Sequence, residues 1–293
     1  MAAPRGMTPA RVLVTGASGF IGRAVVPLLA AEGHEVHAVH HRAAAPEGPG
    51  VAAHRADLLD AAATEDLVAR VRPTHLLHLA WYTDPGGYMT SDANAAWLGA
   101  SVRLLEGFAA AGGRRVVLAG TAAERDPSTP YGAAKRELGE RAAASGLSVA
   151  RARIFAAYGP HERPGRLVPT VVRALLEGRP LELSDGRRGR DVLYVDDVAS
   201  ALALLLAADA EGVVDVGSGE ELSVRGMAEA VAERLGAPGL LRFAARDDGI
   251  GALGLADPSR LRELGWSPRV ALDEGIERTI SWWRAASDDR HAR

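Results

Sequence analysis

The chain has 293 residues, with 34 Lys and Arg against 37 Asp and Glu, a formal net charge of −3 and no cysteine. An acidic balance argues against a nucleic-acid-binding protein, which usually has a basic surface, and the lack of cysteine excludes disulfides, thiol nucleophiles and Cys-ligated metals. No apolar run reaches the roughly 18 residues of a membrane span, and the first ten residues lack the apolar stretch of a secretory signal. We therefore expect a cytoplasmic protein with a loose N-terminal tail, no membrane contact and no metal.

Short apolar runs alternate with helical stretches in the first half of the chain. Strands separated by helices of this length form right-handed βαβ units and a parallel sheet. We therefore predict an α/β fold with a Rossmann-type doubly wound parallel sheet over residues 1–160, with ligands at the carboxyl ends of the strands. The predicted strands are 11–15, 35–40, 74–80, 114–120 and 148–155, and the predicted helices are near 20–32, 60–72, 91–111 and 131–145.

The second half has a looser pattern, with loops rich in Gly, Pro and Arg. We predict that residues 161–293 form a smaller substrate-binding lobe, interleaved with the last sheet strand and the C-terminal helices. The predicted elements are a helix near 167–177, strands at 192–195 and 213–216, and helices near 223–236 and 272–286.

The first predicted strand leads into VLVTGASGFIG, which places Gly16, Gly19 and Gly22 at the start of an apolar helix. Glycines permit a tight turn and let the backbone approach a pyrophosphate, which rests on the helix N-terminus. A plain strand-to-helix turn is the alternative. The position in the first βα turn of an alternating chain favours a dinucleotide site.

The end of the second strand indicates which dinucleotide binds. An Asp or Glu there favours NAD, whereas an Arg accommodates the 2′-phosphate of NADP. This chain has His40, His41 and Arg42 and no acid, and Arg23 adds a positive charge just past the third glycine. We therefore favour NADP(H) and keep NAD as possible, since these side chains would also suit a solvated loop.

Asp57 lies where a residue after the third strand could meet the adenine. A helix N-cap for residues 60–72 is the other interpretation, and the two are not exclusive. We expect further cofactor contacts from Ser18, Phe20, Ile21, Leu58, Leu79, Ala80, Lys135 and Phe155.

The only lysine of the chain, Lys135, follows Tyr131 by four residues in STPYGAAKREL. This spacing places both side chains on one face of a helix. Lowering a phenol pKa from near 10 by about 3 units requires roughly 4 kcal/mol of preferential stabilisation of the phenolate. A lysine ammonium and an oxidised nicotinamide supply a field of the right sign. We therefore predict that Tyr131 exchanges a proton with the substrate, over the alternative of an incidental Tyr–Lys pair on an exposed helix.

Several motifs occur in the order typical of one family. The chain resembles an extended short-chain dehydrogenase/reductase of the NAD-dependent epimerase/dehydratase family, which acts on nucleotide sugars, over nearly its whole length. One departure is Asp215, where the motif more usually has asparagine, and we predict no role for it. The motifs are TGASGFIG (15–22), HLAW (78–81), SVRLLEGFAAAG (101–112), TPYGAAK (129–135), YGPHE (158–162), GRDVLYVDDVA (189–199), DVGSGEELSV (215–224) and LGWSP (264–268).

The resemblance gives Thr121 the place of the Ser or Thr that hydrogen-bonds the substrate oxygen beside Tyr131. A strand-end hydroxyl that satisfies a local turn is the alternative. Dehydratases of the family carry an Asp–Glu pair directly after this Thr. Here Ala122 and Ala123 follow, and Glu124 is out of register, which argues against a 4,6-dehydratase.

The resemblance also implies a site for a small-molecule nucleotide-diphosphate sugar. Arg190 would face the diphosphate, a task suited to a guanidinium fork, and Arg166 is a weaker candidate. For Arg166 solvent exposure is the favoured alternative, and for the tyrosines of the sugar pocket aromatic packing is the alternative. The expected lining of that pocket is Tyr82, Tyr88 and His161.

Two activities fit the set of Thr121, Tyr131 and Lys135. A ketoreductase passes a hydride from NADPH to a keto group, probably C4, of a nucleotide-linked deoxysugar while Tyr131 donates the proton. An epimerase removes a hydride to a retained NAD and returns it to the other face. The missing acid after the second strand favours the reductase; the epimerase and a non-catalytic dinucleotide-sensing protein are the alternatives. The family further implies a homodimer through the two long helices near 91–111 and 131–145.

Overall fold

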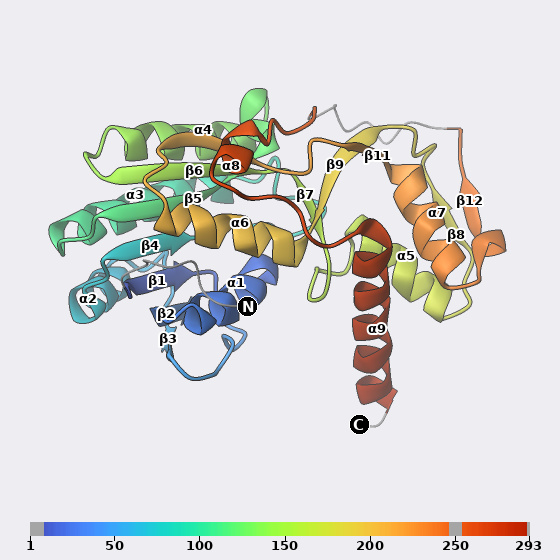
Figure 1. The fold of residues 1–293 in the computed structure, drawn as a ribbon, viewed down its shortest axis with the longest axis horizontal. Helices are drawn as coiled ribbons and strands as arrows, with labels where there is room; N and C mark the ends of the chain where they lie inside the picture. Colours follow the sequence, from blue (N-terminus) through green and yellow to red (C-terminus); the bar gives the residue numbers. More distant parts are fainter. Residues whose placement is uncertain (1–8, 246–253, 292–293) are drawn as a thin grey trace.

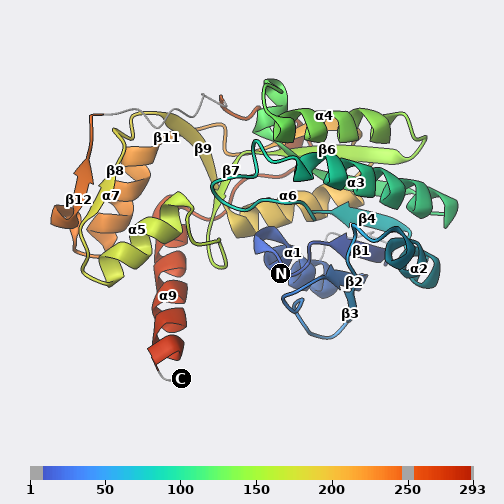
Figure 2. The ribbon, with the colours of Figure 1, turned by 180° about the vertical axis from the view of Figure 1, so that it is seen from behind.

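The computed structural model describes residues 9–245 and 254–291, so most of the expected N-terminal tail lies outside the described residues. Figure 1 shows a part built on one large sheet with helices on both faces, and beside it a lobe that contains α5, α7 and α9. Figure 2 shows the same two parts from behind, with α3 and α4 in front of the sheet.

The central sheet has seven strands, and every neighbouring pair is parallel. This confirms the predicted α/β class with a doubly wound parallel sheet. Strand β3, at the edge of the sheet opposite β10, was not predicted, because its largely exposed side chains give no apolar run. In sheet order the strands are β10 (Gly212–Val216), β6 (Ser148–Ile154), β5 (Arg115–Thr121), β4 (His75–His78), β1 (Arg11–Thr15), β2 (Glu35–His40) and β3 (Val51–Arg55).

Two hydrophobic cores cover the two faces of this sheet, because successive side chains of a strand point to opposite faces. Val12 and Val14 of β1 pack into one core, whereas Leu13 between them packs into the other. The first core contains side chains of α1 (Phe20–Ala31) and α6 (Val195–Ala207). The second contains side chains of α2 (Ala61–Val71), α3 (Ala93–Ala110) and α4 (Pro130–Ala143).

Helix α6 was not predicted from the sequence. Nine of its thirteen residues are buried, so its long apolar run lacks the polar face that marks a surface helix. The two acidic residues in its first turn, Asp196 and Asp197, are the start signal that could have revealed it.

The lobe has its own core, formed largely from α5, α7 and α9. Its strands form a three-stranded sheet in the order β11-β9-β7 and a parallel pair of β12 and β8. The strands are β7 (Ala156–Tyr158), β8 (Leu181–Leu183), β9 (Gly189–Tyr194), β11 (Glu221–Ser223) and β12 (Leu241–Phe243). The helices from β7 onward, apart from α6, are α5 (Leu167–Leu176), α7 (Val224–Arg234), η2 (Pro238–Leu240), α8 (Ser259–Glu263) and α9 (Leu272–His291).

The strand order reverses between β1 and β4, and ligands of doubly wound sheets bind in the crevice at such a point. The Thr15 hydroxyl at the end of β1 accepts the N–H groups of Leu79 and Ala80 at 3.2 and 3.3 Å. It also lies 2.7 Å from Nδ1 of His78, whose pKa is lowered to about 3 by complete burial. A neutral imidazole and a hydroxyl thus tie the end of β1 to the end of β4 and to the loop that follows it.

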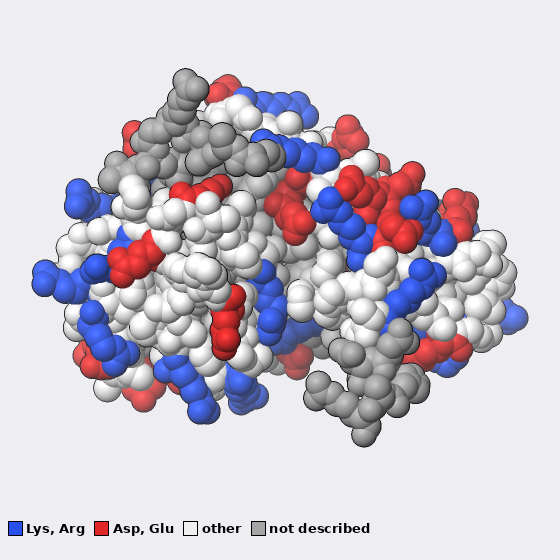
Figure 3. All heavy atoms as spheres, turned by 60° about the horizontal axis from the view of Figure 1, so that its bottom comes forward, with Lys and Arg blue, Asp and Glu red and all other residues white. Residues whose placement is uncertain are grey.

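Among the helices of the described ranges, none is both long and apolar enough to cross a bilayer. Figure 3 shows acidic and basic side chains interspersed over the face that it draws.

Candidate active site

The loop after β1 is compact enough to need its glycines. Gly16 has a φ of +71°, and a Cβ there would lie 2.8 Å from the Ala80 nitrogen. A Cβ on Gly22 would lie 2.3 Å from the Gly16 carbonyl oxygen, a backbone clash that cannot be relieved by a rotamer change. Helix α1 begins after Gly19, which has no side chain to cap its first amides. The result is a cradle of backbone N–H groups at a helix N-terminus, which suits a pyrophosphate.

Arg23 connects this cradle to the loop that follows β2. Its Nε donates to the Ser18 carbonyl at 3.1 Å and its Nη2 donates to the Ala44 carbonyl at 3.1 Å. The predicted second positive charge is therefore present between the two loops, with two of its donors bound to backbone. Phe20 and Ile21 start α1 and pack against the core of the lobe.

The residues predicted at the adenosine end lie together. Nε2 of His41 is 3.8 Å from Oδ2 of Asp57, Arg42 is exposed next to it, and Leu58 is buried. The N-cap interpretation of Asp57 was wrong. Asp60 caps α2 by accepting the Ala63 N–H at 3.2 Å, whereas Asp57 accepts the Leu59 N–H and leaves its other oxygen toward His41.

Thr121, Tyr131 and Lys135 converge where β5 ends and α4 begins. Thr121 is the last residue of β5, and Tyr131 and Lys135 lie one turn apart in the first two turns of α4. The helix starts there because Thr129 caps it through the Gly132 N–H at 3.1 Å and Pro130 takes the first helical position, where a proline costs no hydrogen bond. The Thr121 side chain is close enough to that of Tyr131 to lower the pKa of the phenol.

Lys135 is buried and held from two sides. Its Nζ donates to the Ala119 carbonyl at 2.8 Å and lies 4.0 Å from the centre of the Trp81 ring. Burial lowers the pKa of Lys135 to about 7, against the opposing effect of the Glu124 carboxylate. Trp81 itself is fixed by a hydrogen bond from its Nε1 to Asn94 at 2.8 Å. Neither Trp81 nor Asn94 was predicted as part of the site, although Trp81 lies in the HLAW motif.

The expected lowering of the phenol pKa is not what the protein's own groups produce. Burial raises the pKa of Tyr131, Tyr88 and Glu124 raise it further, and only the hydrogen bond with Thr121 and the charge of Arg166 lower it. The physical reason is desolvation, because Tyr131 is only 9% exposed. On these groups alone Tyr131 is a protonated phenol, the form that donates a proton.

Tyr88 and Arg166, two of the predicted substrate residues, lie beside the Tyr131 phenol. The Tyr88 ring packs edge-on against the Tyr131 ring, with 4.9 Å between centroids. The Arg166 guanidinium lies 4.9 Å from the centre of the Tyr88 ring, and its Nη1 is 3.4 Å from the Tyr88 hydroxyl. The favoured view of Arg166 as a solvated side chain was therefore wrong.

The other predicted substrate residues are His161, Arg190 and Tyr82. The His161 ring stands 4.7 Å from that of Trp282 on α9, and Arg190 on β9 donates to the Gly189 carbonyl at 3.3 Å. Tyr82 is half-buried in the loop after β4. Phe155, which was predicted as a cofactor contact, follows β6, with the Arg125 guanidinium 4.8 Å from the centre of its ring.

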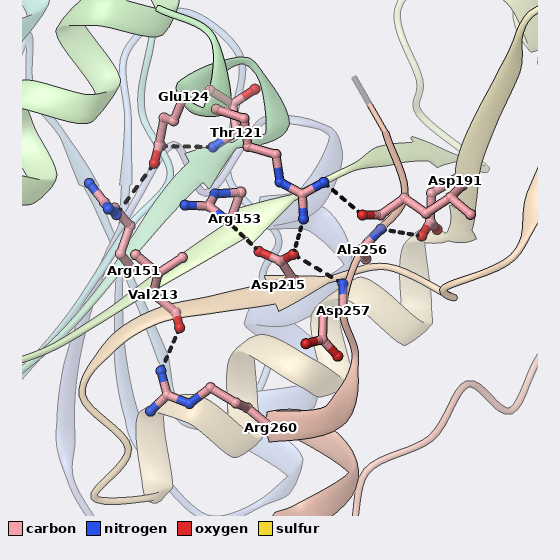
Figure 4. A network of polar contacts seen from close by, with 12 residues as sticks. Thr121, Glu124, Arg151, Arg153, Asp191, Val213, Asp215, Ala256, Asp257 and Arg260 are labelled. Carbon is pink, nitrogen blue, oxygen red and sulfur yellow. Dashed lines mark hydrogen bonds and ion pairs between the residues drawn. The ribbon is translucent and has the colours of Figure 1, made fainter. Parts of the chain in front are cut away.

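Two carboxylates to which no role was given form a network beneath Thr121, which Figure 4 shows. Oε1 of Glu124 accepts the Thr121 N–H at 2.9 Å, and its Oε2 is 3.3 Å from Nε of Arg151. Asp215 pairs with Arg125 at 2.5 Å and with Arg153 at 3.1 Å. The Thr-x-x-Glu spacing of a capping box could have revealed Glu124, but the partners of Asp215 become neighbours only in the fold.

The residues present fit a nicotinamide dinucleotide. Three groups lie at the same edge of the sheet. They are the glycine cradle before α1, the His41–Asp57 pair after β2 and β3, and the Lys135 ammonium on α4. A metal has no comparable site, since the described residues contain no group of three or more His, Asp or Glu side chains that could hold one. The arrangement can bind a dinucleotide and move a proton at the Tyr131 hydroxyl.

Comparisons with known proteins extend over almost the whole chain. A profile described as the NAD dependent epimerase/dehydratase family matches residues 12–217. A UDP-glucose 4-epimerase from Mycolicibacterium smegmatis is 31% identical over 94% of this chain and 99% of its own. The solved UDP-glucose 4-epimerase of Thermus thermophilus in complex with NAD is 30% identical, with a TM-score of 0.84 over 94% of this chain and 99% of that chain. MoeE5 in complex with UDP-glucuronic acid and NAD is 31% identical, with a TM-score of 0.81 over the same shares.

Proposed function

The chain belongs to the NAD dependent epimerase/dehydratase family, and from this membership we propose that it is an NAD-dependent 4-epimerase of a nucleotide sugar. The observation that carries the proposal is the convergence of Thr121, Tyr131 and Lys135 beside the glycine cradle at the carboxyl edge of the sheet. Relatives that match over their full length and are named as UDP-glucose 4-epimerases support a UDP-hexose as the substrate.

The proposed reaction moves one proton and one hydride at C4. Tyr131, as phenolate, takes the proton of the C4 hydroxyl, while the Thr121 hydroxyl holds the same oxygen by a hydrogen bond. A nicotinamide dinucleotide held by the glycine cradle, the His41–Asp57 pair and Lys135 would supply the hydride acceptor, and then the hydride donor, for C4. Tyr131 then gives the proton back to the oxygen of the 4-keto sugar after the sugar has turned its other face.

The charge of Lys135 assists this exchange in both directions. An ammonium one helical turn from Tyr131 stabilises the phenolate that the first step needs. Burial lowers the pKa of Lys135 to about 7, so a large fraction of this side chain carries its charge near neutral pH. Lys135, on the same helix as Tyr131, thus offsets part of the free-energy cost of ionising the buried phenol.

Loss of water from the sugar is not part of the proposal. A dehydratase needs a carboxylate directed at the sugar, and both oxygens of Glu124 are directed instead to the Thr121 N–H and to Arg151. The residues between it and Thr121 are alanines. The side chains on this turn therefore supply neither the acid nor the base of an elimination.

A ketoreductase that uses NADPH is the second candidate, favoured by the end of β2. No carboxylate follows β2, where His41 and Arg42 stand instead, and an acid at this position is what selects the free ribose of NAD. The raised pKa of Tyr131 also suits donation of a proton to a ketone. The NAD-bound structural relatives favour the epimerase.

Identification of the dinucleotide released from the purified, denatured protein separates the two candidates. The epimerase predicts stoichiometric NAD and interconversion of UDP-glucose and UDP-galactose without added cofactor. A protein that is purified empty, does not interconvert these sugars and oxidises NADPH with a 4-keto nucleotide sugar would be the reductase.

We further propose that residues 1–160 bind the dinucleotide and that residues 161–293 bind the nucleotide end of the sugar. A homodimer would pair α3 and α4, which lie side by side on one face of the sheet (Figure 2), with the same helices of a second copy. A cytoplasmic location stays a prediction.

A further inference from the structure

Glu124 is a buried carboxylate that the proposed reaction does not use. It is 2% exposed and lies in the 3-10 turn η1 (Ala122–Arg125) directly after Thr121. Burying a carboxylate is costly unless it is paired and hydrogen-bonded. The chain meets this cost with two partners, the Thr121 N–H at 2.9 Å and the Arg151 guanidinium at 3.3 Å.

Two glycines make the room that this pair occupies. A Cβ on Gly120 would lie 2.6 Å from Oε1 of Glu124, and a Cβ on Gly139 would lie 2.3 Å from Nη1 of Arg151. Gly120 precedes Thr121 on β5, and Gly139 lies on α4, one turn past Lys135. Any larger residue at either position would displace the pair, so the backbone around the site is shaped to hold it.

Glu124 fixes Thr121 through a reciprocal pair of hydrogen bonds. The carboxylate accepts the Thr121 N–H, and the Thr121 hydroxyl in return accepts the Ala123 N–H at 3.3 Å. Since the hydroxyl oxygen is engaged as an acceptor by the turn, its own proton is left to point toward Tyr131, whose pKa the Thr121 side chain lowers. The orientation of the Thr121 side chain is therefore set by the turn that Glu124 closes.

The same turn is tied to the helix that carries Tyr131 and Lys135. Arg136 of α4 donates from Nε to the Glu124 carbonyl at 2.9 Å. Nη1 of Arg151 donates to the Arg136 carbonyl at 3.3 Å. Together with the contacts of Glu124 to Thr121 and Arg151 that Figure 4 shows, these contacts connect β5, β6, η1 and α4 around one carboxylate and hold Thr121 and α4 in register.

We propose that Glu124 is a positioning residue for the reaction: through the N–H of Thr121 it holds the Thr121 hydroxyl at the Tyr131 hydroxyl and at the substrate oxygen. The proposal rests on the proposed function for the step that it assists. It assigns the role to the acceptor oxygen of Glu124, so an amide oxygen at this position can replace the carboxylate.

The test compares Glu124→Ala, which removes the acceptor, with Glu124→Gln, which keeps it. Asp197→Asn is the matched control, because Asp197 is also a buried carboxylate that accepts backbone N–H groups, those of Arg269 and Val270 at 2.9 and 3.1 Å, away from Thr121. The rate is that of nicotinamide reduction in the holoenzyme mixed with UDP-glucose. A second readout, amide hydrogen exchange at Thr121 by NMR, uses no substrate.

We expect Glu124→Ala to lower the rate about 10- to 100-fold with little change in KM, because misplacement by about 1 Å has effects of this size. Exchange of the Thr121 amide should rise at least about tenfold. Glu124→Gln should restore protection and bring the rate to within about threefold of wild type, and Asp197→Asn should change neither.

Wild-type protection of the Thr121 amide in Glu124→Ala would overturn the proposal, as would a rate within about twofold of wild type or equal damage from Glu124→Gln. The exchange measurement decides the geometry even if UDP-glucose does not reduce the bound nicotinamide. Failure of UDP-glucose to reduce the bound nicotinamide would count against the proposed function alone.

Discussion

Asp215 offers the sharpest test of the packing beneath the active site, because asparagine is the more usual residue at its place in the motif. Asp215 is 7% exposed. Its Oδ1 pairs with Nη1 of Arg153 at 3.1 Å, and its Oδ2 pairs with Arg125 and accepts the Asp257 N–H at 3.1 Å. Asparagine would fit the same space but would leave two guanidinium groups without their counter-charge.

The expected loss of stability follows from the burial of these partners. Removing one member of a buried ion pair costs about 3–5 kcal/mol. The Arg125 side chain is 34% exposed and can turn to solvent, so the lower end, about 3 kcal/mol, applies to Asp215→Asn. An unfolding entropy of about 2.1 cal/mol/K per residue gives roughly 0.6 kcal/mol/K for a chain of 293 residues, and hence a Tm lower by about 5 °C.

Thermal and urea unfolding of the purified variant measure this loss. Asp66→Asn is the control, because the Asp66–Arg70 pair is 68% and 60% exposed and should contribute less than about 0.5 kcal/mol. The double variant Asp215→Asn/Arg153→Met should recover part of the stability, since one uncompensated charge is removed with its partner. Asp215→Asn within about 0.5 kcal/mol of wild type would refute the reasoning.

Three further predictions concern single groups of the site and its surroundings. Burial raises the pKa of Glu162 from its ordinary 4.5 to about 8. The free energy of unfolding of the wild type should therefore fall by up to about 1.4 kcal/mol per pH unit as pH rises between these values. Glu162→Gln should flatten this dependence and be the more stable protein near pH 8. Lys135→Arg should slow nicotinamide reduction at least about tenfold in stopped-flow absorbance, because the broader guanidinium does not fit between the Ala119 carbonyl and the Trp81 ring; a rate equal to wild type would contradict this. Gly22→Ala should weaken dinucleotide binding at least about tenfold in calorimetric titration, since its Cβ would meet backbone at 2.3 Å, whereas Gly107→Ala, with open space around it, should bind as wild type does.

The sequence was sufficient for the parts of the site that local patterns encode. Glycine spacing after an apolar strand predicted the cradle, and the Tyr131–Lys135 spacing predicted two side chains on one helix face. The central sheet was predicted wherever a strand is buried on both sides. The exposed edge strand β3 and the largely buried α6 were missed, because neither shows the periodicity that separates strand from helix.

Interactions that depend on the fold were beyond prediction from one sequence. Asp215 and Arg153 become neighbours only through the parallel register of β10 with β6. In the protein without its cofactor, burial under Tyr88 outweighs nearby positive charge and raises the pKa of Tyr131, an effect that the sequence does not reveal. Lys135 is paired with the Trp81 ring and a carbonyl, contacts that its spacing from Tyr131 does not reveal.

The first half-reaction of Tyr131→Phe tests the role of the Tyr131 hydroxyl most simply. Holoenzyme mixed with UDP-glucose reports hydride transfer through the absorbance of reduced nicotinamide, and the content of bound dinucleotide is measured on the same sample. We expect undiminished dinucleotide content and hydride transfer slower by about 10²- to 10⁴-fold, the usual contribution of a proton-transfer group. Hydride transfer at the wild-type rate in this variant would contradict the assignment of the Tyr131 hydroxyl as the group that moves the proton.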